Sequence, residues 1–203
     1  ITVASPTLAF SATKFFNDHD IPWEWVRSES VHEAEGFTLT NAYERTGQLG
    51  PDRWYAAIGA LSLFRGTPLL VVHAGTATTV DSLFQTGDGE YRFMGGRIAP
   101  GPALMHKALL SAVPTLDSGL TEHKDFPLCS SDAITTGIID AQVGLITQAY
   151  ESMCEAGQRP KIILAGGSSR FLAPRLRTLH PTLIVRHNLV LGGLAQKVRE
   201  SKR

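Results

Sequence analysis

The chain has 203 residues, of which 43% are hydrophobic, and its 19 basic side chains balance its 19 acidic ones. This hydrophobic fraction excludes an intrinsically disordered chain, and the zero net charge excludes a general electrostatic attraction to nucleic acid or to a membrane surface. No apolar run approaches the roughly 20 residues of a membrane-spanning helix. Cys129 and Cys154 have neither metal-binding nor redox spacing, so we expect a cytoplasmic protein with reduced thiols and no metal site.

The first 66 residues predict a strand, a helix, a second strand, a polar loop and a second helix. The expected ranges, in this order, are 1–4, 5–17, 23–26, 28–36 and 50–64. The first helix begins with Ser5 as N-cap and Pro6 in its first turn, residue types that helix starts favour. The second helix begins at Gly50 and Pro51, and its apolar side chains recur at helical spacing.

The stretch from Leu69 to Asp81 combines a strand with a hydroxyl-rich turn. Its first four residues form a continuous apolar run, which is typical of a strand buried on both faces. Gly75 allows a sharp turn, and the hydroxyl and N–H groups that follow it could cradle phosphate oxygens. The hydroxyls belong to Thr76, Thr78 and Thr79. The same pattern also fits a hairpin whose threonines are simply good strand formers.

From residue 68 onward the predicted elements follow the order β-β-β-α-α-β-α-β-α. The expected strands are 69–72, 79–84, 91–98, 161–165 and 183–185, and the expected helices are 103–111, 130–157, one starting near 168, and 189–198. In the long helix, Ser130, Ser131 and Asp132 are expected to form the cap. A three-stranded meander followed by alternating helices and strands is typical of a ribonuclease H-like α/β domain.

Three positions along this order could carry chemistry. Asp52 and Arg53 place an acid and a base at a rigid helix start, with Tyr43 upstream, although the helix dipole favours an acid there in any case. The pair Gly166–Gly167 between a strand and a helix start is a natural nucleotide-binding corner, although glycine pairs also end strands for structural reasons alone. The pair Gly95–Gly96 inside a strand indicates a close approach of backbone or ligand.

Taken together and in order, these motifs resemble the type III pantothenate kinases. The matching residues are Tyr43, the stretch 49–54 (LGPDRW), the stretch 75–79 (GTATT), the stretch 95–101 (GGRIAPG) and Gly166–Gly167. The resemblance implies transfer of phosphate from ATP to pantothenate, the first step of coenzyme A biosynthesis. It also implies the fold of the superfamily of acetate and sugar kinases, heat-shock chaperone ATPases and actin. On this basis residues 1–66 are expected to be the C-terminal part of a first, N-terminally truncated ribonuclease H-like domain, and residues 67–203 the second domain.

The resemblance also implies roles for individual residues. Asp52 would be the catalytic proton acceptor, and Arg53 could hold the pantothenate carboxylate. The expected substrate-binding residues are Tyr43, Gly50, Pro51, Asp52, Arg53 and Ser130, and the expected ATP-binding residues are Gly75, Thr76, Gly166 and Gly167. Ser130 stands where the family usually has threonine, so the hydroxyl is kept, although a helix-capping role explains it equally well. The enzyme would use ATP with Mg²⁺ and act as a homodimer with the pantothenate site at the interface.

Two departures from the family pattern stand out. The family opens with an Asp-x-Gly-Asn phosphate motif that is absent here, and the chain begins without methionine, as if inside a strand. We therefore expect an upstream segment. His73 replaces an aspartate that usually holds a monovalent cation. Hard cations prefer oxygen ligands, so the cation site is expected to be absent or rebuilt, with His73 either neutral or supplying positive charge itself.

Two other functions fit parts of the pattern. A non-catalytic accessory or regulatory member of the same family, like the Bvg accessory factors, would agree with the missing motif and with His73. A sugar or acetate kinase of the same superfamily would share the fold, but the Gly-Pro-Asp-Arg-Trp stretch from Gly50 to Trp54 disfavours it.

Overall fold

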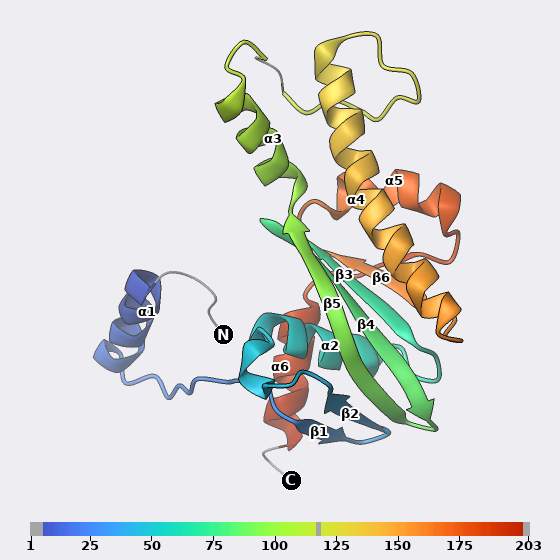
Figure 1. Cartoon of the computed structure of the whole chain (residues 1–203). Helices are drawn as coiled ribbons and strands as arrows, with labels where there is room; N and C mark the ends of the chain where they lie inside the picture. Colours follow the sequence, from blue (N-terminus) through green and yellow to red (C-terminus); the bar gives the residue numbers. More distant parts are fainter. Residues whose placement is uncertain (1–5, 117–118, 201–203) are drawn as a thin grey trace.

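The computed structural model describes residues 6–116 and 119–200 (Figure 1). The strand expected over residues 1–4 and the Ser5 cap lie outside the described residues. The helices are α1 (Pro6–Asp18), α2 (Pro51–Leu63), α3 (Pro102–Ala112), α4 (Ser130–Glu155), α5 (Ser169–Leu179) and α6 (Leu189–Glu200), with a 3-10 turn at Thr46–Gln48. The strands are β1 (Val31–Ala34), β2 (Phe37–Asn41), β3 (Leu69–Ala74), β4 (Ala77–Gly87), β5 (Glu90–Pro100), β6 (Lys161–Ala165) and β7 (Ile184–Val185).

The strands form one seven-stranded sheet in the order β1-β2-β5-β4-β3-β6-β7. Strands β3, β4 and β5 are an antiparallel meander, while β6 is parallel to β3 and β7 is parallel to β6. This is the ribonuclease H-like topology, and it confirms both the fold class and the element order expected from residue 68 onward. The hairpin β1–β2 extends the sheet through the parallel pairing of β2 with β5. The domain boundary at residues 66 and 67 stays a prediction.

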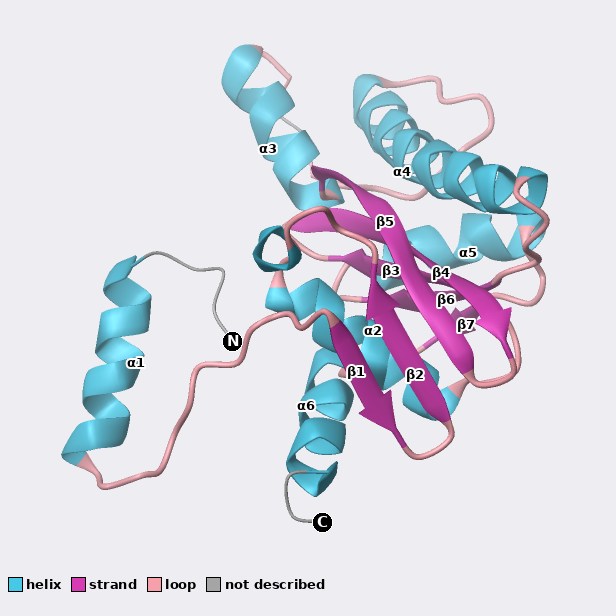
Figure 2. Ribbon diagram, turned by 60° about the horizontal axis from the view of Figure 1, so that its bottom comes forward, coloured by secondary structure: helices cyan, strands magenta, loops and turns pink. Residues whose placement is uncertain are grey.

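Helices cover both faces of the sheet (Figure 2). Because successive side chains of a strand point to opposite faces, β3 contributes Leu69 and Val71 to one core and Leu70 and Val72 to the other. The first core packs against α2 and α6, and the second packs against α4 and α5. This two-sided burial explains the continuous apolar run in β3.

Helices α2 and α6 cross with their backbones in contact. A Cβ at Gly59 would overlap the Leu189 carbonyl, and a Cβ at Gly193 would overlap the Tyr55 carbonyl. Only glycine allows this approach, because any larger residue would push the two helices apart. Helix α2, which begins at Pro51, therefore packs directly against α6, the last described helix of the chain.

Three parts of the predicted secondary structure need correction. The strand predicted over residues 23–26 is wrong: this segment is irregular, and the indole N–H of Trp23 donates to Asn17 Oδ1 at 2.8 Å. The polar loop predicted over residues 28–36 contains β1, an edge strand of which only His32 is fully buried. Such a strand shows too little apolar alternation to be recognised from its sequence. Strand β2 was not predicted at all.

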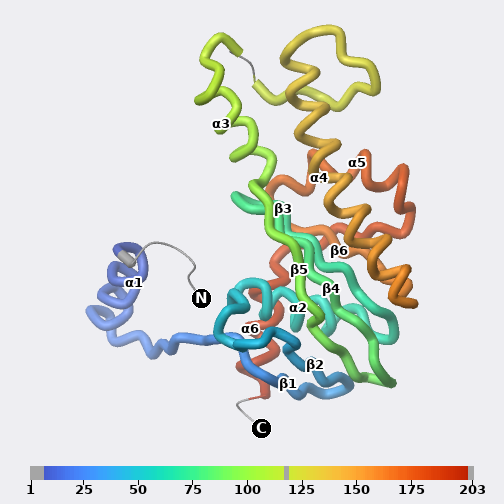
Figure 3. Tube along the Cα trace, viewed as in Figure 1, coloured from blue at the N-terminus to red at the C-terminus, as the bar shows by residue number. Residues whose placement is uncertain are grey.

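Two helices project from the body of the molecule (Figures 1 and 3). Helix α1 lies beside the sheet at the end of an extended connection, and its Phe10 side chain is 70% exposed. Helix α3 continues from the end of β5, and the N-terminal half of α4 rises beside it. Among the described helices, none is both long and apolar enough to cross a membrane.

Candidate functional site

A buried ion pair joins Arg53 of α2 to Asp81 of β4. Arg53 Nε and Nη2 both donate to Asp81 Oδ1, at 2.9 and 2.5 Å, and Nη1 donates to the Tyr43 hydroxyl at 2.9 Å. Arg53 is 7% exposed and Asp81 is 1% exposed. The guanidinium carbon lies 5.7 Å from the Tyr43 ring centroid and 5.6 Å from that of Phe93. The pair therefore ties α2 to β4 and to the segment that carries Tyr43.

The sheet explains why a glycine stands opposite this ion pair. Asp81 lies on the α2 face of the sheet, as does Leu83 two residues later. Across the ladder Asp81 is paired with Gly96 of β5, where a Cβ would overlap the carboxylate and the Arg53 guanidinium. The close approach expected at Gly95–Gly96 is found at Gly96 alone, where the ion pair and the Val80 carbonyl approach; nothing lies within 4 Å of a Cβ at Gly95.

Burial and pairing act against each other on these two charges. Burial raises the pKa of Asp81 to about 6, although its hydrogen bonds from Arg53 and the charge of Arg53 act to lower it. Burial also acts to lower the pKa of Arg53, but Asp81 and Tyr43 hold that pKa above its usual range. At neutral pH both partners are therefore ionised, and the pair carries no net charge.

Asp52 occupies the first turn of α2, directly before the paired arginine. The helix N-cap is Gly50, and Asp52 Oδ1 lies so close to Gly50 that a Cβ there would come within 2.5 Å of it. The helix dipole favours a negative charge at this position. The charge of Asp52 acts on both Asp81 of β4 and His73 of β3.

His73 lies near the carboxyl end of β3 with an exposed side chain. Its ring packs near Gly75, where a Cβ would lie 3.2 Å from His73 Cε1. Desolvation lowers the pKa of His73, and the charge of Asp52 acts in the opposite direction. The imidazole is therefore neutral at neutral pH when no anion is bound, and it offers nitrogen where a hard cation prefers oxygen.

Of the four residues expected to bind ATP, Gly166 and Gly167 line a hollow of about 270 Å³, whereas Gly75 and Thr76 do not. Its lining residues are His73, Gly166, Gly167 and 187–191. Gly166 adopts a φ of +93°, and a Cβ there would overlap the Ala74 carbonyl. The turn after β6 thus closes against the end of β3, so the carboxyl ends of both strands open into one space. Ligands of open α/β sheets bind at this edge.

Gly75 and Thr76 form the turn between β3 and β4. The Gly75 N–H donates to the Ala77 carbonyl at 3.0 Å, and the Thr76 carbonyl accepts from the Gly101 N–H at 2.8 Å. The backbone of this turn is therefore fixed, while the Thr76 side chain is exposed and that of Thr78 is fully buried. Only the first of these two threonines presents its hydroxyl to the outside of the fold.

Ser130 lies apart from these residues. It is the first residue of α4, which packs on the opposite face of the sheet from α2 and whose N-terminal half extends past the sheet (Figure 1). The prediction that Ser130 caps this helix is wrong by one position, because the N-cap is Cys129, whose backbone is extended, while Ser130 is already helical.

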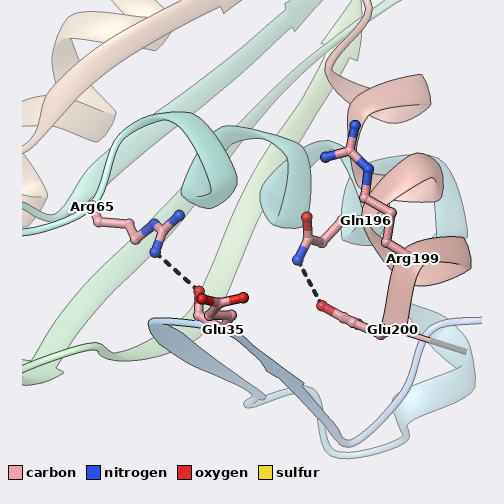
Figure 4. Close-up of a pocket in the computed structure, with 5 residues that line it drawn as sticks. All are labelled: Glu35, Arg65, Gln196, Arg199 and Glu200. Carbon is pink, nitrogen blue, oxygen red and sulfur yellow. Dashed lines mark hydrogen bonds between the residues drawn. The ribbon is translucent and has the colours of Figure 1, made fainter. Parts of the chain in front are cut away.

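A second hollow, of about 320 Å³, lies at the opposite end of α2 from Asp52 (Figure 4). It is lined by Glu35, Arg65, Gln196, Arg199 and Glu200. Arg65 Nη1 donates to the Glu35 carbonyl at 3.0 Å, and Gln196 Nε2 donates to Glu200 Oε1 at 2.8 Å. These contacts engage the Arg65, Gln196 and Glu200 side chains within the fold, and the hollow is lined by no residue that the sequence predicts to be functional.

Two features of the site were missed at the level of sequence. Asp81 was identified only as the end of the central stretch, although an acid at an inward position of a strand is itself a signal for a buried partner. His187 and Asn188 line the hollow on the α6 side, and Asn188 adopts a φ of +60°. An asparagine directly before a helix is a recognisable cap candidate, so this position was accessible to prediction.

Metal binding has no dedicated cluster in the part of the chain that the structure describes. No group of three or more histidine, cysteine, aspartate or glutamate side chains there could hold a metal ion. Neither Asp52 nor Thr76 lines the hollow, but the Asp52 carboxylate, whose charge acts on His73, and the exposed Thr76 in the turn after β3 offer oxygen donors. This donor set fits a Mg²⁺ ion that arrives with nucleotide phosphates, since Mg²⁺ is commonly held by one or two carboxylates together with phosphates.

Comparison with known proteins identifies one family. The sequence model of the type III pantothenate kinases matches residues 2–152. The chain is 36% identical over 182 residues to the type III pantothenate kinase of Acidovorax ebreus, covering 87% of this chain and 66% of the relative. It is 40% identical over 169 residues to that of Burkholderia ambifaria, covering 77% and 62%. The chain therefore spans slightly less than two thirds of the length of these relatives.

A solved structure supports the fold. A Campylobacter jejuni protein assigned to the Baf family of transcriptional activators superposes with a TM-score of 0.54 at 23% identity. The match covers 79% of this chain and 67% of that protein. At this identity the likeness concerns the arrangement of helices and strands.

Proposed function

Because the chain belongs to the type III pantothenate kinase family, we propose that the protein phosphorylates pantothenate with ATP, the first step of coenzyme A biosynthesis. The observation that carries the proposal is the position of Asp52. It stands in the first turn of a helix that the Arg53–Asp81 pair anchors, and its charge acts on His73, which lines the hollow beside Gly166. The names of the matched relatives point to the same reaction.

Asp52 would orient the primary hydroxyl of pantothenate and accept its proton. Phosphoryl transfer passes through a loose transition state, so positioning and charge neutralisation contribute more than a strong base does. Tyr43, Gly50, Pro51 and Arg53 would line the pantothenate site around Asp52. Arg53 has part of its donor capacity committed to Asp81 and Tyr43, so only its remaining N–H groups could reach a substrate carboxylate.

ATP would bind along the edge formed by β3 and β6. Gly75 and Thr76 would contact the phosphates, and Gly166 and Gly167 would form the adenosine-side turn. A Mg²⁺ ion bound with the nucleotide would be held by the phosphates beside the Thr76 hydroxyl and would supply positive charge for the developing negative charge, which leaves the Asp52 carboxylate to accept the substrate proton. Bound phosphates would favour a protonated His73, which would then supply positive charge where relatives use a monovalent cation.

We further propose that the protein is a cytoplasmic homodimer whose pantothenate site lies at the interface. Ser130 and Asp52 belong to helices on opposite faces of the sheet. Their separation within one chain supports a site to which Ser130 contributes from a second copy. Residues 1–66 and 67–203 would belong to two successive ribonuclease H-like domains.

The test is a coupled kinase assay on the intact protein with pantothenate, acetate and a panel of sugars. We expect phosphorylation of pantothenate alone, and we expect Asp52→Asn to lower kcat by about 10²–10⁴-fold, the usual contribution of positioned proton transfer. Asp18→Asn, in the exposed pair of α1 with Lys14, is the matched control and should keep full activity. An inactive wild type that binds neither substrate would instead support the non-catalytic alternative.

A second arm of the assay concerns His73. Initial rates are measured in sodium, potassium and ammonium salts at matched ionic strength. If His73 replaces the cation, the wild type should be nearly insensitive to the salt, and His73→Asp should become dependent on potassium or ammonium. Strong stimulation of the wild type by potassium would contradict this role.

A further inference from the structure

We propose that Asp81 is a positioning residue of the kinase site, which acts through Arg53 to fix the first turn of α2 and the direction of Asp52. The inference rests on the proposed function. Asp81 belongs to β4, in the middle of the sheet, and is 1% exposed. Because the Asp81 carboxylate is enclosed, it acts through its neighbours and does not contact a ligand.

The contacts of Arg53 hold its guanidinium in one orientation. Of its five N–H donors, Nε–H and one on Nη2 go to Asp81, and one on Nη1 goes to the Tyr43 hydroxyl. The side chain also lies against the Tyr43 and Phe93 rings. Tyr43 and Arg53 are both proposed to contact the substrate. The single buried carboxylate of Asp81 therefore sets the position of two substrate-binding residues.

Asp81 also determines the charge around Asp52. The charge of Asp52 acts on Asp81 of β4 and on His73 of β3, and Arg53, the next residue of its own helix, pairs with Asp81. While the ion pair is intact, Arg53 and Asp81 cancel, so Asp52 is the one uncompensated negative charge of this group. Removing the charge of Asp81 would leave Arg53 as an unbalanced cation beside the proton acceptor.

Stability alone does not account for such a pair. A buried ion pair is weak evidence for stability, because well-packed apolar residues of similar volume are often as stable or more so. The fold nevertheless makes room for this one: Gly96 lacks the Cβ that would overlap both partners. A role of the Arg53–Asp81 pair in setting the geometry of Asp52 explains why the fold makes room for the pair.

The decisive variant is Asp81→Asn, which keeps the shape and one oxygen acceptor but removes the charge. We expect kcat with pantothenate to fall about 10–100-fold, since small misplacements near the reacting atoms have effects of this size. The KM for ATP should stay within about twofold, because the nucleotide contacts are unchanged. The pH–rate profile should also change, because Arg53 would then carry a charge that no buried carboxylate balances.

The control is Glu29→Gln. This change removes the carboxylate that pairs with Lys197 of α6, away from the site. It should leave kcat and the pH profile unchanged. Urea unfolding of both variants shows whether the protein is folded under assay conditions. A readout independent of activity is the Arg53 Nε–H proton in NMR spectra, which should exchange slowly in the wild type and rapidly in Asp81→Asn.

The outcomes separate the two proposals. If the wild type does not phosphorylate pantothenate, the proposed function fails, while the Nε–H measurement still reports whether Asp81 fixes Arg53. If the wild type is active and folded Asp81→Asn has the same kcat and pH profile, the positioning role is wrong. It is equally wrong if Glu29→Gln produces the same losses, since the effect would then be general.

Discussion

Among the carboxylates that pair with basic side chains, Asp81 and Asp132 have surroundings that give them opposite properties. Asp81 pairs with Arg53 inside the fold, and burial raises its pKa to about 6. Asp132, in the first turn of α4, pairs with Lys124 at 2.6 Å, and the hydrogen bonds from Lys124 and Thr121 lower its pKa to about 2. In the Asp132 pair the Lys124 side chain is 56% exposed and the Asp132 side chain 11%, whereas in the Asp81 pair the Arg53 and Asp81 side chains are 7% and 2% exposed.

The difference shows that solvent access, more than the presence of a cation, decides what an ion pair does. Where water reaches the pair, hydrogen bonds to the charged form dominate and the acid is stabilised as a carboxylate. Where water is excluded, desolvation outweighs the attraction of a well-placed guanidinium. A buried pair of this kind is suited to fixing geometry, because breaking it leaves an uncompensated charge.

The largest expected effect follows from breaking the buried pair on its basic side. Arg53→Met should lower the free energy of unfolding by about 3–5 kcal/mol at pH 8, because it strands the Asp81 carboxylate. The loss should be smaller at pH 5, where Asp81 takes up a proton. Urea unfolding at both pH values measures this, with Lys124→Met as the matched change at the exposed pair. Equal losses for the two variants would contradict the comparison.

The pH dependence of stability sharpens the contrast at Asp81. Its pKa is raised on folding from 3.8 to about 6, so the folded state binds the proton more tightly than the unfolded state. The stabilisation that Asp81 contributes to the folded state is therefore present below about pH 4 and is lost as the pH rises through 6. The unfolding free energy of the wild type minus that of Asp81→Asn should fall over this window. A difference that rises with pH would refute the assignment.

The smallest effect is expected at the exposed pair, with the opposite sign. The pKa of Asp132 is lowered on folding to about 2, so its contribution is present above about pH 4 and is lost as the pH falls through 2. Asp132→Asn should leave thermal unfolding at pH 7 almost unchanged, because solvent screens such pairs. The wild type should lose its small stability advantage over Asp132→Asn as the pH falls. Melting curves between pH 5 and pH 2 would record this loss.

The central part of the fold was predictable because its signals are local. The apolar run of β3, the proline-led start of α2 and the glycine turn after β6 each specify structure within a few residues. The hairpin β1–β2 was not predictable, because its short edge strands owe their conformation to pairing with β5. Residues 23–26 show the reverse error: alternation in the sequence indicates a strand only where a neighbouring strand is present to pair with it.

The site was predictable to a similar extent. The motifs around Asp52 and Gly166 identified two groups of residues, but the sequence contains nothing that links Arg53 to Asp81 across 28 positions. That link depends on the register of β4 against β5, which places Gly96 beside Asp81. The separation of Ser130 from Asp52 likewise depends on which face of the sheet each helix covers, a property of the assembled fold.

The contact between Gly59 and Gly193 has a consequence for the order in which the protein folds during its synthesis. Helix α2 is synthesised before α6, the last of the described helices, so α2 has no packing partner until residues 189–200 have been made. Contacts between residues this distant in sequence form slowly, since the intervening chain must first be brought together. The turn that carries Asp52 is therefore completed only near the end of folding, and a stalled or shortened nascent chain would leave the apolar face of α2 exposed to chaperones or to aggregation.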